Sequence, residues 1–161
     1  MSWKSSFTTR AESILDSARM ALRRSPAALP TGELLRAIDE SGPSLARGVL
    51  TALDVNIDET LERARIIAGD RGLDLPLRWL PSLPASFDVI LRRSMEEAEM
   101  LGYRIVGTEH LLLAMLSVYD DPTTSALRVA GVTQDTARGT LRRLQMAWTD
   151  DGRPRPRVTV A

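Results

Sequence analysis

The sequence predicts an all-α fold: a pseudo-twofold duplication of a four-helix unit, with about eight helices in total. Two observations predict the helices, since apolar residues recur at three- and four-residue steps and since prolines and glycines cut the chain into short segments. A third observation predicts the duplication, because the second half repeats the residue pattern of the first.

The first predicted helix runs from about Thr9 to Arg24. Thr9 and Glu12 have the spacing of a capping box, in which the hydroxyl and the carboxylate each satisfy a backbone N–H of the first turn. We therefore expect Thr9 at the start of this helix. Its core-facing stripe consists of Ala11, Ile14, Leu15, Ala18 and Leu22.

Three shorter helices, joined by tight turns, are expected in the rest of the first half. Gly42 and Pro43 end the first of them. Asn56 and Glu59 repeat the capping spacing before the last, which is expected to end near Gly69. The core-facing positions of the three helices are Leu34, Leu35 and Ile38, then Leu45, Val49, Leu50 and Leu53, then Thr60, Ala64 and Ile67.

Residues 69–86 are predicted to connect the two halves. Their sequence, GDRGLDLPLRWLPSLPAS, holds three prolines and two glycines, which rule out a long helix. The leucines and Trp79 are too apolar for a flexible tether, so we expect the connector to pack along the surface.

The helical pattern returns in the second half. A long helix is expected from Phe87 to Leu101, then a short one, then a third around Leu127. The fourth is expected to reach Trp148 and contains Gly139, where glycine costs about 1 kcal/mol relative to alanine. Residues 149–161 carry no apolar stripe and are predicted to form a disordered tail.

The duplication keeps its register over most of the chain. Phe7, Ala18 and Met20 recur eighty residues later as Phe87, Ala98 and Met100. After a three-residue difference in the first loop, the spacing is seventy-seven: Thr31, Leu34, Leu35, Ala37, Leu50, Val55 and Asp58 match Thr108, Leu111, Leu112, Ala114, Leu127, Val132 and Asp135. We therefore predict one domain over residues 1–148, with repeat 1 at about 7–68, the connector at 69–86 and repeat 2 at about 87–148.

Composition excludes several kinds of site. The chain has no cysteine and one histidine, so disulfides, thiolate metal sites and histidine-rich metal sites are excluded. Twenty-one basic and twenty-one acidic side chains give zero net charge, so no overall field draws the protein to nucleic acid or membrane. The sequence shows neither a signal-peptide pattern nor an apolar run of membrane-spanning length. We expect a cytoplasmic monomer without a cofactor.

Repeat 2 resembles the N-terminal repeat of Clp ATPases. The resemblance is carried by VGTEHLLLAML at residues 106–116, which a helix containing EEAEMLG precedes and a short helix ending in AGV follows. Repeat 1, with FTTRAESILDSARMALRRSPAALPTGELLRAI at residues 7–38, is similar to the same unit less closely. The chain is thus similar to the double-repeat Clp N-terminal domain of ClpC-type unfoldases from about Phe7 to Trp148.

This resemblance implies a binding function. In the family, the domain usually precedes ATPase modules that unfold proteins for a proteolytic chamber, and it receives substrates or adaptor proteins. The sequence contains no GxxxxGKS or GxxxxGKT phosphate loop, so we expect a protein similar to the free-standing members, a non-catalytic accessory or adaptor-like protein. The expected partners are Clp-type unfoldase or protease subunits, substrate proteins, adaptor proteins and cyclic peptides.

Two alternative functions stay open at this point. One is docking on the Clp protease ring or the unfoldase to regulate assembly, as similar free-standing plant members do. The other is sequestering cyclic-peptide antibiotics that target the unfoldase N-domain, as similar actinobacterial proteins do. An enzyme is not expected, because the sequence has no GxSxG nucleophile elbow and a serine triad would have to centre on His110 at a helix start.

The ligand-binding residues are expected in the GTEH motif, at Thr108, Glu109 and His110. Relatives of the Gram-positive unfoldases bind phosphorylated arginine with the glutamate of this motif, so the resemblance implies that role for Glu109. Thr108 is expected to cap a helix whose N–H groups favour a phosphate, while the carboxylate pairs with the guanidinium. The alternative for Glu109 is stabilisation of its own helix by about 0.3–1 kcal/mol. The alternative for His110 is a local structural hydrogen bond.

Repeat 1 departs from this motif. Thr31 matches its threonine, but Gly32 stands in place of its glutamate and Glu33 in place of its histidine. We expect the first-repeat site to be altered or lost. Losing one of two linked sites leaves a monovalent receptor, whose affinity falls by the effective-concentration factor.

Two charged clusters have simpler interpretations. Glu96, Glu97 and Glu99 are expected on the solvent side of their helix, where they serve no acid–base chemistry. The arginines at positions 153, 155 and 157 are too few for strong binding to nucleic acid. We expect them in a solubilising tail or a short docking segment.

Overall fold

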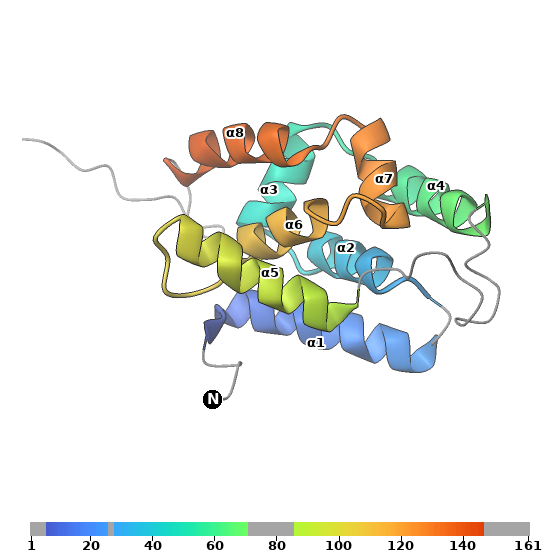
Figure 1. The fold of residues 1–161 in the computed structure, drawn as a ribbon, viewed down its shortest axis with the longest axis horizontal. Helices are drawn as coiled ribbons and strands as arrows, with labels where there is room; N and C mark the ends of the chain where they lie inside the picture. The colour runs from blue at the N-terminus through green and yellow to red at the C-terminus, as the bar shows by residue number, and fades with distance from the viewer. Residues whose placement is uncertain (1–5, 26–27, 71–85, 147–161) are drawn as a thin grey trace, which may run out of the picture.

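A computed structural model describes residues 6–25, 28–70 and 86–146 of the 161-residue chain. Within these ranges the chain forms eight α-helices and no named β-strand, which confirms the all-α prediction (Figure 1). The helices are α1 (Thr9–Arg24), α2 (Pro30–Glu40), α3 (Leu45–Ala52), α4 (Ile57–Asp70), α5 (Phe87–Met100), α6 (Thr108–Leu116), α7 (Pro122–Val129) and α8 (Gln134–Gln145).

The capping pattern identifies the N-cap of α4 correctly but not that of α1. Thr8 is the N-cap there, since its side chain accepts a hydrogen bond from Ala11 N at 3.2 Å, so the assignment of the cap to Thr9 was wrong. The reason is backbone conformation: Thr8 is extended, as an N-cap requires, whereas Thr9 is already helical. Asn56 caps α4 as predicted, because its Oδ1 accepts from Glu59 N at 3.1 Å.

The second helix of each repeat lies at the centre of the core. All nine residues of α6 are buried, and α6 packs against α1, α3, α5, α7 and α8. Its sequence, TEHLLLAML, is apolar around most of the helix circumference, as expected for a helix that is surrounded by other helices. In repeat 1, α2 holds the matching place and packs against α1, α3, α4 and α7.

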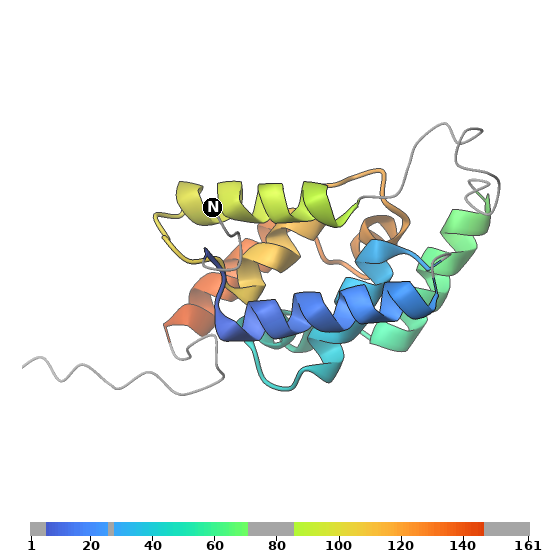
Figure 2. The same ribbon diagram turned by 90° about the horizontal axis from the view of Figure 1, so that it is seen from below.

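The packing scheme has pseudo-twofold symmetry. α1 packs on α2 as α5 packs on α6, and the third helix of each repeat packs on the fourth helix of the other, α3 on α8 and α7 on α4. Figure 2 shows α1 and α5 running in opposite directions along one side of the molecule. Exchanging the repeats therefore maps these four contacts onto one another, which confirms the predicted duplication.

The last helix is shorter than predicted. α8 ends at Gln145 with Met146 as its C-cap, so the expected extension to Trp148 was wrong. Two other predictions, the packing of Trp79 in the connector and the tail over 149–161, lie outside the described residues and stay predictions. Among the helices that the structure describes, none is both long and apolar enough to cross a membrane.

Candidate functional site

The Gly-Thr-Glu-His motif forms the first turn of α6. Gly107 is the N-cap residue and Thr108 is the first helical residue, so the expectation that Thr108 caps the helix was wrong. The Thr108 hydroxyl instead accepts a hydrogen bond from Ala46 N, at 3.2 Å, in the first turn of α3. Thr108 therefore joins the two repeats, because α3 belongs to repeat 1.

His110 closes the first turn of α6. Its Nδ1 accepts a hydrogen bond from Gly107 N at 2.9 Å, and its ring is fully buried. The Tyr103 ring lies beside it, with 5.1 Å between ring centroids and 58° between the ring planes. Since Nδ1 is an acceptor here, the proton of the neutral ring resides on Nε2. The local structural hydrogen bond considered for His110 is thus present.

The carboxylate of Glu109 is folded back against Gly107. A Cβ atom at position 107 would collide with both carboxylate oxygens, so the glycine is needed for close approach and not for its backbone angle. The Glu109 side chain is only 6% exposed, and its Oε1 lies 3.9 Å from His110 Nδ1. A negative charge at this place also favours the N-terminal end of α6.

The start of α2 is built differently. Its N-cap is Leu29, which makes no side-chain capping bond, and Pro30 is its first residue. Pro30 matches Gly107 in the seventy-seven-residue register, so a side chain stands where repeat 2 has none. Gly32 is buried, and a Cβ there would lie in ordinary contact with Leu29, Thr123 and Leu61. Repeat 1 therefore lacks both members of the glycine–glutamate pair.

The two matched threonines make matching contacts between repeats. The Thr31 hydroxyl lies 2.8 Å from Asp121 Oδ2 and 2.9 Å from Thr123 Oγ1, at the start of α7. The Thr108 hydroxyl reaches the start of α3 but accepts a hydrogen bond there, from Ala46 N, whereas Thr31 donates one to Asp121. Each second helix is thereby fixed to the third helix of the other repeat. This structural role accounts for the burial of both threonines.

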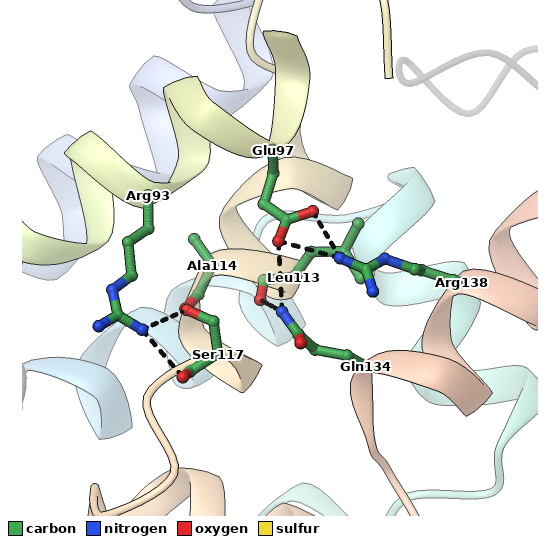
Figure 3. A network of polar contacts seen from close by, with 7 residues as sticks. All are labelled: Arg93, Glu97, Leu113, Ala114, Ser117, Gln134 and Arg138. Carbon is green, nitrogen blue, oxygen red and sulfur yellow. Dashed lines mark hydrogen bonds and ion pairs between the residues drawn. The ribbon is translucent and has the colours of Figure 1, made fainter. Parts of the chain in front are cut away.

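Sequence reasoning missed a polar network between α5, α6 and α8 (Figure 3). Glu97 accepts hydrogen bonds from Arg138 Nη2 at 3.1 and 3.0 Å and from Gln134 Nε2 at 3.3 Å. Gln134 also donates to Leu113 O at 3.1 Å. The prediction that Glu97 faces solvent was wrong, because this side chain is buried, whereas Glu96 and Glu99 are exposed as expected.

The helical period contains the signal that places Glu97 inside. Ile90, Ser94 and Glu97 follow at steps of four and three, and all three are buried. A carboxylate on such a stripe requires a partner, which α8 supplies.

Arginines from the first helices close the C-terminal ends of the second helices. Arg93 Nη1 donates to Ser117 O and Ser117 Oγ, both at 2.9 Å, at the end of α6 (Figure 3). In repeat 1, Arg10 Nη1 donates to Ser41 O at 2.6 Å at the end of α2. A cation is favourable at both places because unpaired carbonyl groups concentrate there. The two arginines are therefore structural.

These features define a class of protein, a duplicated all-helical repeat domain with a Gly-Thr-Glu-His helix start at its centre. Residues 82–152 match the family model described as the Clp repeat (R) N-terminal domain. Through this segment the chain belongs to the Clp repeat N-terminal domain family, as the resemblance implied.

Three relatives show how far the similarity extends. The negative regulator of genetic competence ClpC/MecB of Bacillus subtilis (strain 168) is 30% identical over 133 residues, which are 82% of this chain and 16% of that protein. The chloroplastic chaperone protein ClpC of Pisum sativum is 29% identical over 126 residues, and the match covers 69% of this chain and 13% of that protein. An ATP-dependent Clp protease ATP-binding subunit ClpA homolog of Guillardia theta is 34% identical over 86 residues, and the match covers 53% of this chain and 10% of that protein. The chain thus matches only a small part of each relative.

Proposed function

We propose that the chain is a non-catalytic binding module of a Clp-type protease system, located in the cytoplasm, that binds substrate proteins, adaptors or peptides. The observation that carries the proposal is the similarity to ClpC/MecB over 133 residues. That length exceeds a single repeat of this chain, so the similarity extends into both repeats. The function that a complete N-terminal domain performs in such a protein is therefore the best guide to this one.

Glu109 is the proposed ligand-binding residue. Its carboxylate lies at the N-terminal end of α6, where a cationic group would pair with the carboxylate and an attached phosphate would meet helix N–H groups. A phosphorylated arginine side chain combines these two groups. Because the carboxylate is buried against Gly107 in the structure, ligand pairing requires the side chain or the preceding loop to move.

We propose a single such site in each chain. In repeat 1, Gly32 supplies no carboxylate, and Pro30 fills the position that Gly107 leaves open in repeat 2. A ligand with two phosphorylated arginines therefore gains nothing from a second site on the same chain.

A crosslinking pull-down from the native cell tests the proposal. The wild-type chain is expected to capture Clp subunits or protease substrates, and Glu109→Ala is expected to lose them. Glu33→Ala is the matched control, since it removes an acidic residue from the first turn of α2 and is expected to keep the partners. Capture of neither Clp subunits nor protease substrates by the wild type would contradict the binding function, and unchanged capture by Glu109→Ala would move the site elsewhere.

A thermal-shift titration with N-phospho-L-arginine tests the ligand. At a hundred times the dissociation constant, a bound ligand adds about 2.7 kcal/mol to the free energy of unfolding. The wild type is expected to show this stabilisation and Glu109→Ala to lack it. Equal shifts in both proteins would contradict the assignment of the site to Glu109.

A further inference from the structure

The N-terminal residues Ser6–Thr8, here called the strap, cross from repeat 1 to the loop that precedes α6. Val106 N donates to Ser6 O at 2.7 Å and Thr8 N donates to Val106 O at 2.9 Å, so Phe7 and Val106 form a parallel β-bridge. Both of these side chains are buried. Figure 2 shows the start of the described chain beside the loop between α5 and α6.

This loop, residues 101–107, covers the first turn of α6. Val106 directly precedes Gly107, against which the Glu109 carboxylate lies. Tyr103 places its ring beside His110. Movement of the loop away from α6 would therefore uncover both the carboxylate and the imidazole.

The strap holds the end of the loop that lies next to α6. At the other end, Gly102 N and Tyr103 N donate to backbone carbonyls of α5. Two of the large side chains of this loop are exposed, Tyr103 at 41% and Ile105 at 53%. Segments with few buried contacts open at low free-energy cost, so the two strap hydrogen bonds and the Phe7 side chain have a large share in keeping this loop closed.

The contact between the strap and the loop is found at the second helix of repeat 2. Among the described residues, the one isolated β-bridge is that between Phe7 and Val106. Phe87, which matches Phe7, is instead partly buried beneath Arg19, whose guanidinium carbon lies 6.0 Å from the ring centroid. The strap thus covers the helix start that retains the glutamate.

We propose that the strap is a latch: its release lets the loop 101–107 rise from Glu109, so that strap release and ligand binding at Glu109 are coupled. The proposal rests on the ligand-binding role of Glu109 given above. A closed majority state lowers the apparent affinity by the fraction of open molecules, and weakening the latch restores that affinity.

The first experiment compares Phe7→Ala with Phe87→Ala in the full chain. In Phe7→Ala, the rate of amide hydrogen exchange at Val106 and Gly107 is expected to increase about tenfold more than the exchange rate in α4, whereas Phe87→Ala is expected to show no such difference. N-phospho-L-arginine is expected to bind about tenfold more tightly to Phe7→Ala. An exchange increase in Phe7→Ala that is no larger at Val106 and Gly107 than in α4 would overturn the latch.

A second variant guards against general destabilisation by Phe7→Ala. The chain has no cysteine, so Phe7→Cys with Val106→Cys offers one redox-controlled link between strap and loop. Oxidation is expected to weaken N-phospho-L-arginine binding about tenfold and reduction to restore it. Equal affinities in the two redox states would overturn the coupling. If the probe binds neither the wild type nor any variant, the ligand assignment fails, whereas hydrogen exchange still decides whether the strap holds the loop.

Discussion

The Glu109 carboxylate lies against the α-carbon of Gly107, in the space that a Cβ atom at position 107 would occupy. The two positions are therefore coupled: the glycine permits the glutamate conformation, and the glutamate fills the space that the glycine leaves. In repeat 1 both members of the pair are replaced, by Pro30 and Gly32. Because the glycine and the glutamate depend on each other, we expect a repeat to have both of them or neither.

Gly107→Ala is predicted to displace the Glu109 carboxylate and to lower the free energy of unfolding by about 1 kcal/mol, because the carboxylate loses its favourable place at the helix N-terminus. Urea denaturation followed by circular dichroism measures this change. In a Glu109→Ala background the same substitution is predicted to cost much less. Equal costs in the two backgrounds would show that the residues are not coupled.

Thr31→Val and Thr108→Val are predicted to destabilise the protein by about 1–3 kcal/mol each, because each removes a buried hydrogen bond between repeats. In Thr108→Val, the Ala46 N–H loses its hydroxyl acceptor. Thr51→Val, at an exposed position of α3, is the control and is predicted to change stability by less than about 0.5 kcal/mol. Equal urea midpoints for all three variants would refute a structural role for the hydroxyls.

Most of the fold follows from local patterns in the sequence. The apolar stripe and the flanking breakers place α1 at Thr9–Arg24, the range that the structure shows. The repeat register also predicts which residues are equivalent, since Thr31 and Thr108 make the matching contacts that equivalence requires. What no local pattern indicates is the exchange of packing partners, by which α3 lies on α8 and α7 lies on α4.

The candidate site was harder to predict because its threonine acts over a long distance in sequence. Thr108 and Ala46 are 62 residues apart, so a capping pattern read within one turn assigns the hydroxyl to the wrong partner. Glu97 and Arg138 are 41 residues apart, so no local pattern identifies the partner that the buried Glu97 carboxylate requires. The hydrogen bond from Gly107 N to His110 Nδ1 is local in sequence, and it is the structural hydrogen bond that was considered as the alternative role of His110.

Arg138→Ala is predicted to lower the free energy of unfolding by about 1–3 kcal/mol, because it leaves the Glu97 carboxylate, 9% exposed, with the Gln134 amide as its remaining partner in the network of Figure 3. The arginine side chain is 29% exposed, so water offsets part of the full cost of breaking a buried ion pair. Arg142→Ala, at an exposed position of the same helix, is predicted to be nearly neutral. Equal urea midpoints for the two variants would show that the pair contributes nothing.

Gly32 gives a prediction of opposite sign to that for Gly107. A methyl group at Gly32 would meet Leu29 Cβ at 3.5 Å, Thr123 Oγ1 at 3.6 Å and Leu61 Cδ2 at 3.7 Å, which are ordinary contacts. Gly32→Ala is therefore predicted to raise the free energy of unfolding by about 0.5–1 kcal/mol through helix propensity. Gly32→Glu is predicted to lower the free energy of unfolding by about 1–3 kcal/mol, because its longer charged side chain starts at a buried position and has no glycine beside it to fold against. Urea denaturation of both variants checks the reversal of sign, and stabilisation by Gly32→Glu would show that one substitution is enough to accommodate the missing carboxylate.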